Sequence, residues 1–314
     1  MLVPVVEVEE FSQFLKVACC EIERDVIRTV DLDCRFHAVT IPAAGNLFAE
    51  SLRRAPVLAA VVLRTMKVQI FSLRERPDLI PLVFSNDLEN VWPEFMRHDA
   101  TAKLYFGQSA FFDYLDYAFG ALLDGEIVGR AFGVPFAFNI EGRTELPDGG
   151  WDQVIRWAHE DRLVGRRPTT ISALEIALVP KARGIGNALA MLDSLKACAK
   201  KMGFAEMFAP VRPSQKRLGS RMAMREYITL QRADGLPTDS WLRTHVNVGG
   251  KIVKIAPYSM TIVGTIAEWS QWTGAAFDRS GPTEVEGALV PVLVSVEQNY
   301  GVYVEPNVWI QHAL

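Results

Sequence analysis

The segment from Glu175 to Leu192, which reads EIALVPKARGIGNALAML, constrains the fold of this chain more than any other part. A buried strand is predicted over residues 171–179, because a run of mainly apolar residues ends there at Pro180. A helix is predicted over residues 187–202, with Gly203 following it in the position of a C-terminal cap. The segment therefore predicts a strand that leads through a glycine-containing turn into a helix.

Such a turn is suited to hold an anion. Gly184 and Gly186 let the backbone bend so that successive N–H groups point into one concavity. The helix that follows adds its unpaired N-terminal amides and the positive end of its dipole. Arg183 can add a charge-assisted contact to the same group. Together these features predict a site for phosphate or pyrophosphate without identifying the ligand.

Three classes of ligand use such a turn, and two of them fit poorly. A nucleoside triphosphate loop requires Gly-Lys-Ser or Gly-Lys-Thr, which this turn lacks. A dinucleotide-binding turn requires a small residue where Leu189 stands, and Glu206 lies within the next strand instead of after it. The pair Asp124-Gly125 between two apolar runs also predicts an antiparallel hairpin, which fits a doubly wound parallel sheet badly. A dinucleotide-binding oxidoreductase is kept only as a weaker alternative.

The third class fits the turn itself. Residues 183–188, Arg-Gly-Ile-Gly-Asn-Ala, match R-x-x-G-x-A. This pattern resembles the pyrophosphate signature of the GNAT acetyltransferase superfamily, and Val179-Pro180 before it and Leu189 after it also resemble that family's strand–loop–helix core. The six-residue motif alone leaves a tight glycine-rich turn without a ligand as an alternative.

The order of the predicted elements resembles the same family. After a strand over 67–71, the order is a helix over 88–98 capped by Asp87, a helix over 101–117, the Asp124-Gly125 hairpin, a helix over 151–162, the strand and helix around the turn, and a strand over 204–211. The resemblance covers residues from about 85 to 230 and extends only loosely over 235–314, where strands are predicted over 251–255, 259–265 and 288–296. This order predicts a mixed α/β fold, with a central mixed sheet flanked by helices and a β-rich C-terminal elaboration.

The resemblance implies that the chain binds acetyl-CoA or another acyl-CoA as co-substrate and transfers the acyl group directly to an amine. It implies that the turn holds the pyrophosphate, with Arg183 assisting, and that the pantetheine arm pairs with the preceding strand. A strand N–H near Ala177 or Leu178 would polarise the thioester carbonyl. No metal is expected. The predicted cofactor-binding residues are Ala177, Leu178, Val179, Arg183, Gly184, Ile185, Gly186, Asn187 and Ala188.

Two residues are candidates for proton transfer. Glu175 lies inside the predicted core strand, where burial would raise the pKa of a carboxyl group and suit it to general-base work; the alternative is a Glu that faces solvent or pairs with a nearby Arg. In the resembling family the thiolate is often protonated by a Tyr after the last core strand, which implies this role for Tyr227, although Tyr227 could equally be a packing residue. Three basic residues after the strand could reach the 3′-phosphate of CoA or belong to a solvated loop: Arg212, Lys216 and Arg217.

Composition narrows the possible functions and locations. The net charge of −4 and the pI of about 5.8 argue against a general electrostatic hold on nucleic acid. No apolar run reaches the roughly 20 residues of a membrane-spanning helix, and the acidic N-terminus lacks the basic region of a secretory signal. The four cysteines show no zinc-type spacing and are too few for a disulfide framework. A cytoplasmic protein is expected.

The chain is expected to divide at residue 66. Residues 1–65 lack a clean pattern of elements and are interpreted either as a small N-terminal extension or as a stretch that precedes the natural start at Met66. Residues 66–314 are expected to form the acyltransferase domain, with an elaboration over about 235–314 that shapes the acceptor site or a homodimer interface.

The function predicted is that of an acyl-CoA-dependent N-acyltransferase acting on a small-molecule or peptide amine. A non-catalytic module that binds acyl-CoA is the alternative from another class, and turnover would distinguish the two. Fold alone does not identify the acceptor.

Overall fold

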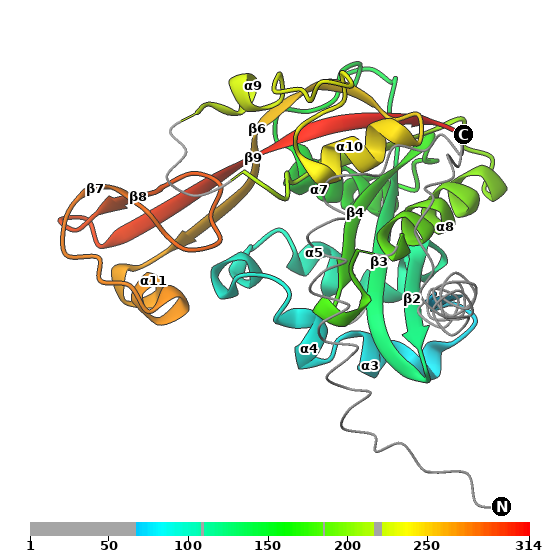
Figure 1. The fold of residues 1–314 in the computed structure, drawn as a ribbon, viewed down its shortest axis with the longest axis horizontal. Helices are drawn as coiled ribbons and strands as arrows, with labels where there is room; N and C mark the ends of the chain where they lie inside the picture. Colours follow the sequence, from blue (N-terminus) through cyan, green and yellow to red (C-terminus); the bar gives the residue numbers. More distant parts are fainter. Residues whose placement is uncertain (1–66, 108–109, 185, 217–221) are drawn as a thin grey trace, which may run out of the picture. The chain divides into compact units, whose positions relative to one another are not determined.

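The computed structural model describes residues 67–107, 110–184, 186–216 and 222–314 (Figure 1). The predicted N-terminal extension over residues 1–65 lies outside the described residues. Within the described residues, a mixed sheet of nine strands is flanked by helices, which confirms the predicted fold class. No described helix combines the length and the apolar character needed to cross a bilayer.

The elements of the described residues have the following bounds. The strands are β1 Gln69–Ser72, β2 Ala118–Leu123, β3 Glu126–Phe136, β4 Thr170–Leu178, β5 Glu206–Val211, β6 Lys251–Gly264, β7 Gly281–Thr283, β8 Val292–Ser295 and β9 Tyr300–Ala313. The α-helices are α3 Ile80–Val83, α4 Asn86–Glu89, α5 Lys103–Phe106, α6 Ala110–Asp113, α7 Gly150–Leu163, α8 Asn187–Lys201, α9 Met224–Tyr227, α10 Ser240–Asn247 and α11 Ile266–Thr273. Short 3₁₀ turns cover η1 Pro77–Leu79, η2 Glu94–His98, η3 Leu115–Tyr117 and η4 Pro180–Ala182.

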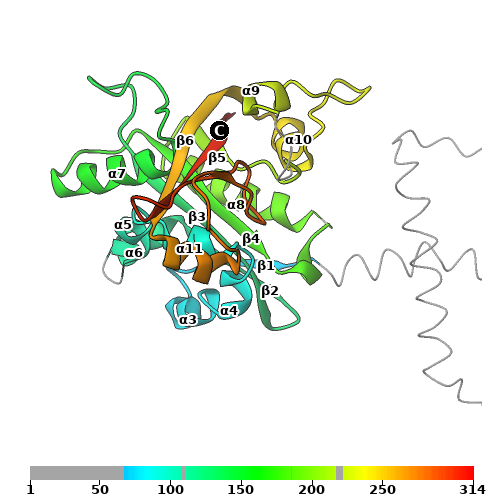
Figure 2. The same ribbon diagram turned by 90° about the vertical axis from the view of Figure 1, so that its left-hand side faces the viewer.

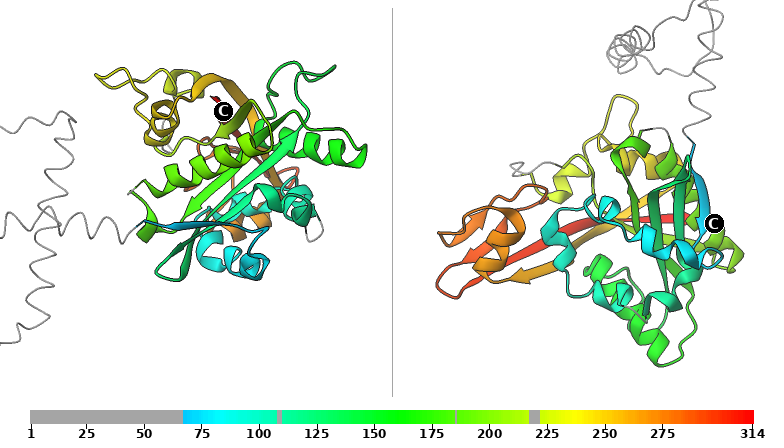
Figure 3. Two further views of the ribbon diagram at one scale, coloured as in Figure 1. Left: turned by 90° about the vertical axis from the view of Figure 1, so that its right-hand side faces the viewer. Right: turned by 90° about the horizontal axis from the view of Figure 1, so that it is seen from below.

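The sheet is antiparallel except at one place. β1 to β4 lie side by side in chain order, and each neighbouring pair among them is antiparallel. β5 is parallel to β4, and β9 is antiparallel to β5. One edge of β9 pairs with β5 and β8, and its other edge pairs with β6. β6 and β9 extend away from the other strands and carry α11, β7 and β8 at their far end (Figures 1 and 3).

Hydrophobic clusters cover both faces of the central strands. On β3, Phe132 packs in one cluster with Ile155 of α7. Its neighbour Ala131 packs in a second cluster with Leu192 of α8. Because successive side chains of a strand point to opposite faces, α7 and α8 cover opposite faces of the sheet (Figure 2). The helices predicted over 151–162 and 187–202 and the strands that they cover are therefore confirmed.

The hairpin between β2 and β3 is the one predicted from Asp124-Gly125. Both residues have positive φ, 52° and 85°, which is the conformation that a two-residue type I′ turn requires.

The two long helices predicted before this hairpin are wrong. The segment 88–98 is divided between α4 and η2, because Pro93 stands at the start of η2 with an extended ψ of 139°. Asp87 lies inside α4 instead of capping a longer helix. The segment 101–117 is interrupted at Gly107, whose ψ of 145° ends α5. Short turns of helix therefore replace continuous ones, and they place several different side chains next to β4.

The C-terminal strands complete the sheet. The strands predicted over 251–255 and 259–265 are one strand, β6, with a register shift between Ala256 and Met260. β8 covers only part of the strand predicted over 288–296. β9 has no counterpart among the predicted strands, yet it pairs with every residue of β5. Residues 235–314 thus supply a strand of the main sheet as well as the lobe at its end.

Candidate active site

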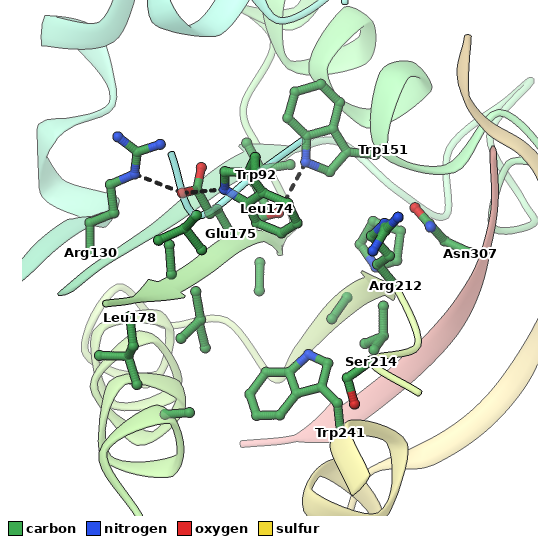
Figure 4. A pocket seen from close by; sticks show the side chains of 18 of the residues that line it. Trp92, Arg130, Trp151, Leu174, Glu175, Leu178, Arg212, Ser214, Trp241 and Asn307 are labelled. Carbon is green, nitrogen blue, oxygen red and sulfur yellow. Dashed lines mark hydrogen bonds and ion pairs between the residues drawn. The ribbon is translucent and has the colours of Figure 1, made fainter. Parts of the chain in front are cut away.

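A cavity opens where β4 and β5 separate. The two strands pair only at Ile171–Met207 and Ser172–Phe208, near their N-terminal ends. Beyond these pairs lies a cavity of about 1020 Å³. Its walls come from β4, the turn before α8, the residues after β5, helix α10 and the segment between α3 and α5. Figure 4 shows side chains from these elements converging on the same space.

A bulge in β4 shapes the inner wall of this cavity. Phe132 of β3 pairs with Glu175 while Gly133 pairs with Ala173, so Leu174 is an extra residue in the ladder. Its carbonyl oxygen accepts a hydrogen bond of 3.0 Å from Trp151 Nε1 (Figure 4). The bulge therefore fixes the Trp151 indole at the cavity wall.

Alternate residues of β4 turn their backbone polar groups away from β3, toward the cavity. Val179 donates its backbone N–H to the Val128 carbonyl of β3. The backbone N–H and C=O groups of successive strand residues point to opposite sides, so those of Ala177 also point toward β3. Leu178 and Ile176 then face away from β3, and the Leu178 carbonyl accepts from Arg183 Nε at 2.9 Å. Of the predicted strand residues, Leu178 has the geometry to contact a ligand through its backbone, and Ala177 and Val179 do not.

The turn before α8 has the conformation that the sequence predicts. Gly184 and Gly186 have φ of 85° and 82°, and a Cβ built at either position would meet no atom of the described residues within 4 Å. α8 begins at Asn187 without a side-chain cap, so its first amides have no helical acceptor. Asn187 holds the turn closed by donating to the Ala182 carbonyl at 3.0 Å. Ile185 lies outside the described residues. That this turn binds a pyrophosphate stays a prediction.

Glu175 is an ion-paired residue of the cavity wall. Its Oε1 accepts hydrogen bonds from Arg130 Nε at 2.7 Å and from Trp92 Nε1 at 3.1 Å (Figure 4). Arg130, which is 3% exposed, also donates to Glu89 Oε1 at 2.5 Å. The Glu–Arg pairing considered from the sequence is therefore present. Glu175 also lines the cavity, and Oε2 takes part in none of the hydrogen bonds found among the described residues. Its role as a general base stays a prediction.

Tyr227 is the last residue of α9, which follows β5 in the chain. It does not belong to the described cavity wall, and its hydroxyl donates to Asp239 Oδ2 at 2.9 Å. Burial, with the charge of Asp239, raises the pKa of Tyr227 well above its usual value. Asp239 caps α10 by accepting from the amides of Trp241 and Leu242. The geometry therefore supports a structural role for Tyr227, in holding the N-terminus of α10, and does not support the acid role.

The basic residues after β5 are directed away from the turn before α8. Arg212 pairs with Glu305 of β9 at 2.9 Å, and Lys216 donates to the Leu289 carbonyl at 2.8 Å. Lys216 is 5% exposed, so it is a buried residue and not part of a solvated loop. Arg217 lies outside the described residues. The contacts of Arg212 and Lys216 do not support a role in binding the 3′-phosphate.

Two buried aspartates, Asp99 and Asp152, have no counterpart among the predicted site residues. Asp99 lines the cavity, is 1% exposed and accepts the Thr101 amide at 2.7 Å. Burial, followed by the charge of Asp99 beside it, raises the pKa of Asp152 to about 8, so this carboxyl group is more readily protonated than an exposed aspartate. No motif indicated this pair, because the two residues lie on different elements.

Two histidines also meet in the interior. His245 of α10 lines the cavity, and its Nδ1 lies 2.9 Å from Nε2 of His312 on β9. Burial, followed by the charge that His312 and Lys196 would place beside it, lowers the pKa of His245 to about 3. Burial and Lys196 lower the pKa of His312 to about 4. Both imidazoles are therefore neutral at pH 7, and one of the two nitrogens, His245 Nδ1 or His312 Nε2, donates its hydrogen to the other.

Comparison with known proteins adds a relative of known activity. No family model matches the chain. The chain is 29% identical over 268 residues to arginine N-acetyltransferase avaD of Aspergillus versicolor, which covers 76% of this chain and 91% of that protein.

Solved structures that match the chain have low TM-scores. The loading GNATL domain of CurA from Lyngbya majuscula matches with a TM-score of 0.44 and 17% identity, over 78% of this chain and 97% of that one. An agmatine N-acetyltransferase matches with a TM-score of 0.37 and 11% identity, over 79% of this chain and all of the other.

TM-scores below 0.5 do not establish a correspondence of residues, so the assignment depends on the curated relative and on this chain's own strand–turn–helix segment. The relative is an N-acetyltransferase, and the strand–turn–helix segment resembles that of N-acetyltransferases. The mixed sheet of this chain is the fold that this resemblance implies. The chain is similar over most of its length to an N-acetyltransferase, and its strand–turn–helix segment resembles the pyrophosphate signature of the GNAT superfamily; both support an acyl-CoA-dependent N-acyltransferase.

Proposed function

We propose that this enzyme transfers an acetyl group from acetyl-CoA to an amino group of arginine or of a small amine of similar size and charge. The observation that carries the proposal is that one continuous cavity has an amide-lined turn at one end and charged and aromatic side chains at the other. The 29% identity to an arginine N-acetyltransferase supports the choice of acceptor.

The donor is proposed to bind along β4 and the turn before α8. The pyrophosphate would lie in front of Gly184 and Gly186, at the N-terminus of α8, where the positive end of the helix dipole favours an anion. Arg183 is exposed and its Nε is already held by the Leu178 carbonyl, so its outer nitrogens can contact the phosphates. The pantetheine arm would pair with the cavity-facing backbone groups of Ile176 and Leu178.

The acceptor is proposed to bind beyond the bulge in β4. The indoles of Trp92 and Trp151 and the carboxylate of Glu175 surround this part of the cavity (Figure 4). Aromatic walls with a few polar groups are common in small-molecule sites. A carboxylate oxygen of Glu175 that faces the cavity suits a cationic amine.

The chain's own residues then supply the steps of the transfer. The acceptor ammonium gives a proton to Glu175 Oε2, and the neutral nitrogen forms a bond to the thioester carbonyl carbon. An amide of β4, at Leu178 or Ile176, donates a hydrogen bond to the carbonyl oxygen as it becomes negative. The carbon–sulfur bond breaks, and the CoA thiolate takes up the second proton that the nitrogen releases.

Release of the CoA thiol in the presence of acetyl-CoA and a panel of amines tests this proposal. Arginine should give turnover, and Glu175→Gln should lower kcat/KM by about 100-fold or more without changing the Kd of CoA. Glu206→Gln is a matched control, because Glu206 is also a hydrogen-bonded strand glutamate but does not line the cavity. Binding of acetyl-CoA without turnover of any amine would contradict the proposal, and full activity of Glu175→Gln would remove Glu175 from it.

A further inference from the structure

We infer that Arg212 binds a carboxylate of the acceptor and makes the enzyme prefer amino acids over amines that lack this group. The inference rests on the proposed function, because it assigns a specificity-determining residue to the same acceptor end of the cavity. Arg212 follows β5 directly and lines the cavity on the side opposite Glu175 (Figure 4).

The guanidinium of Arg212 is held on one side and open on the other. Its Nε donates to both carboxylate oxygens of Glu305, at 2.9 and 3.1 Å, and its Nη2 donates to the Gly287 carbonyl. Nη1 takes part in none of the hydrogen bonds found among the described residues, and the side chain is 22% exposed. The free end of the guanidinium therefore remains available to a ligand in the cavity.

A second layer of buried residues fixes this arrangement. Glu305 is fully buried and also accepts from Tyr303 Oη at 2.6 Å and from Asn307 Nδ2 at 3.0 Å. Asn307 in turn accepts from Ser259 Oγ at 2.6 Å. Every oxygen of the Glu305 carboxylate thus has a donor, and Arg212 is held in a single orientation.

Such an arrangement is better explained by recognition than by stability. A buried ion pair contributes little to folding compared with well-packed apolar residues of the same volume, because both charges lose their hydration. A rigid guanidinium with an open end has the planar donor geometry that matches a carboxylate. Its charge and its fixed position are therefore suited to an anionic group of a ligand.

The other cations of the cavity wall are less suited to this role. Arg97 pairs with Glu94 at 2.6 Å, and Arg130 pairs with Glu175 and Glu89. Arg183 lies at the turn proposed to hold the pyrophosphate. Lys103 is exposed and makes no ion pair among the described residues, so it is the other candidate for binding the acceptor carboxylate.

The opposite walls then match a zwitterion. A free amino acid carries an ammonium and a carboxylate, and the cavity presents Glu175 on one side and Arg212 on the other (Figure 4). With the ammonium at Glu175, near the bulge in β4, the carboxylate of the same molecule would face Arg212. An amine without a carboxylate would leave the Nη1 end of Arg212 without a partner.

Kinetics with arginine and agmatine, which is arginine without its carboxylate, test the inference. The parent enzyme should prefer arginine in kcat/KM by about 10- to 100-fold, the usual contribution of one charge-assisted contact. Arg212→Lys and the double variant Arg212→Gln/Glu305→Gln should remove this preference by raising the KM for arginine, with agmatine changed less than about twofold. The double variant avoids leaving the buried Glu305 unpaired.

Controls separate this inference from a structural effect. Arg232→Gln/Asp234→Asn removes an exposed arginine–aspartate pair outside the cavity and should leave the preference intact. The role of Arg212 would be overturned if its variants lost activity equally toward arginine and agmatine, or if they changed the KM for acetyl-CoA. It would also be overturned if Lys103→Gln, and not the Arg212 variants, lost the preference for arginine.

A binding measurement distinguishes failure of the inference from failure of the proposed function. If no amine is turned over, the proposed function fails, and calorimetric titration of arginine and agmatine in the presence of CoA still tests Arg212. Tighter binding of arginine that disappears in the double variant supports the inference. Equal binding of both compounds to the parent enzyme contradicts it.

Discussion

Substitution of Gly186 by Ala tests the cradle before α8 with a quantitative expectation. The φ of 82° lies in the left-handed region, where an L-residue other than glycine costs about 1–2 kcal/mol. The new Cβ would meet no atom within 4 Å in the part of the chain that the structure describes, so the loss of stability should come from the backbone conformation. The same methyl group would occupy the space proposed for the pyrophosphate. Loss of one charge-assisted contact, about 1.5–3 kcal/mol, would raise the Kd of CoA by about 10- to 150-fold.

Gly235 is a matched control for this substitution. Its φ is 77°, a Cβ there would also meet no atom within 4 Å, and the residue does not line the described cavity. Urea unfolding should show a similar loss of stability for Gly186→Ala and Gly235→Ala, whereas calorimetric titration with CoA should show weaker binding only for Gly186→Ala. Equal loss of stability with unchanged CoA binding in both variants would refute the assignment of the turn as the pyrophosphate site.

Two further predictions follow from the site and the interior. Arg183→Ala should raise the Kd of CoA by about 10-fold or more, because it removes a charge-assisted contact, and calorimetry that gives the parent's Kd would exclude Arg183 from the site. His245 and His312, with pKa values of about 3 and about 4, are neutral when folded, whereas the unfolded chain takes up protons below pH 6.5. Stability should therefore fall as the pH drops from about 6.5 toward 4, by about 2 kcal/mol per imidazole at pH 5. In the variant His245→Gln/His312→Gln, the free energy of unfolding measured with urea should fall less between pH 7.5 and pH 5 than in the parent. The same fall in both proteins would disprove the contribution of the two imidazoles.

Features that depend on a few neighbouring residues could be predicted from the sequence. The strand, turn and helix around residues 183–188 follow from Pro180, two glycines and an apolar run, and the structure contains them at nearly the expected bounds. The Asp124-Gly125 hairpin is equally local, because positive φ at both residues suffices to specify it. The resemblance to the GNAT superfamily depends on the same segment, because the features that predict an anion site belong to the turn itself.

Local patterns were misleading where a single residue interrupts an element. The sequence predicts continuous helices over 88–98 and 101–117, but Pro93 and Gly107 divide them. The consequence reaches the site, because the short turns that replace these helices bring Trp92 and Glu89 to Arg130 and Glu175.

Pairings between distant residues were decided by the tertiary structure alone. Arg130–Glu175, Arg212–Glu305 and His245–His312 join elements that meet only because β9 pairs with β5 and β3 pairs with β4. No periodicity within one segment carries information about its partner across the sheet, so the sequence predicts the proposed donor site but not the charged pairs at the proposed acceptor end. The cavity itself arises from the separation of β4 and β5, which depends on how the whole sheet twists and on what packs against it. The local sequence thus determined where the glycine-containing turn proposed to bind CoA lies, and the assembled sheet determined which side chains face it.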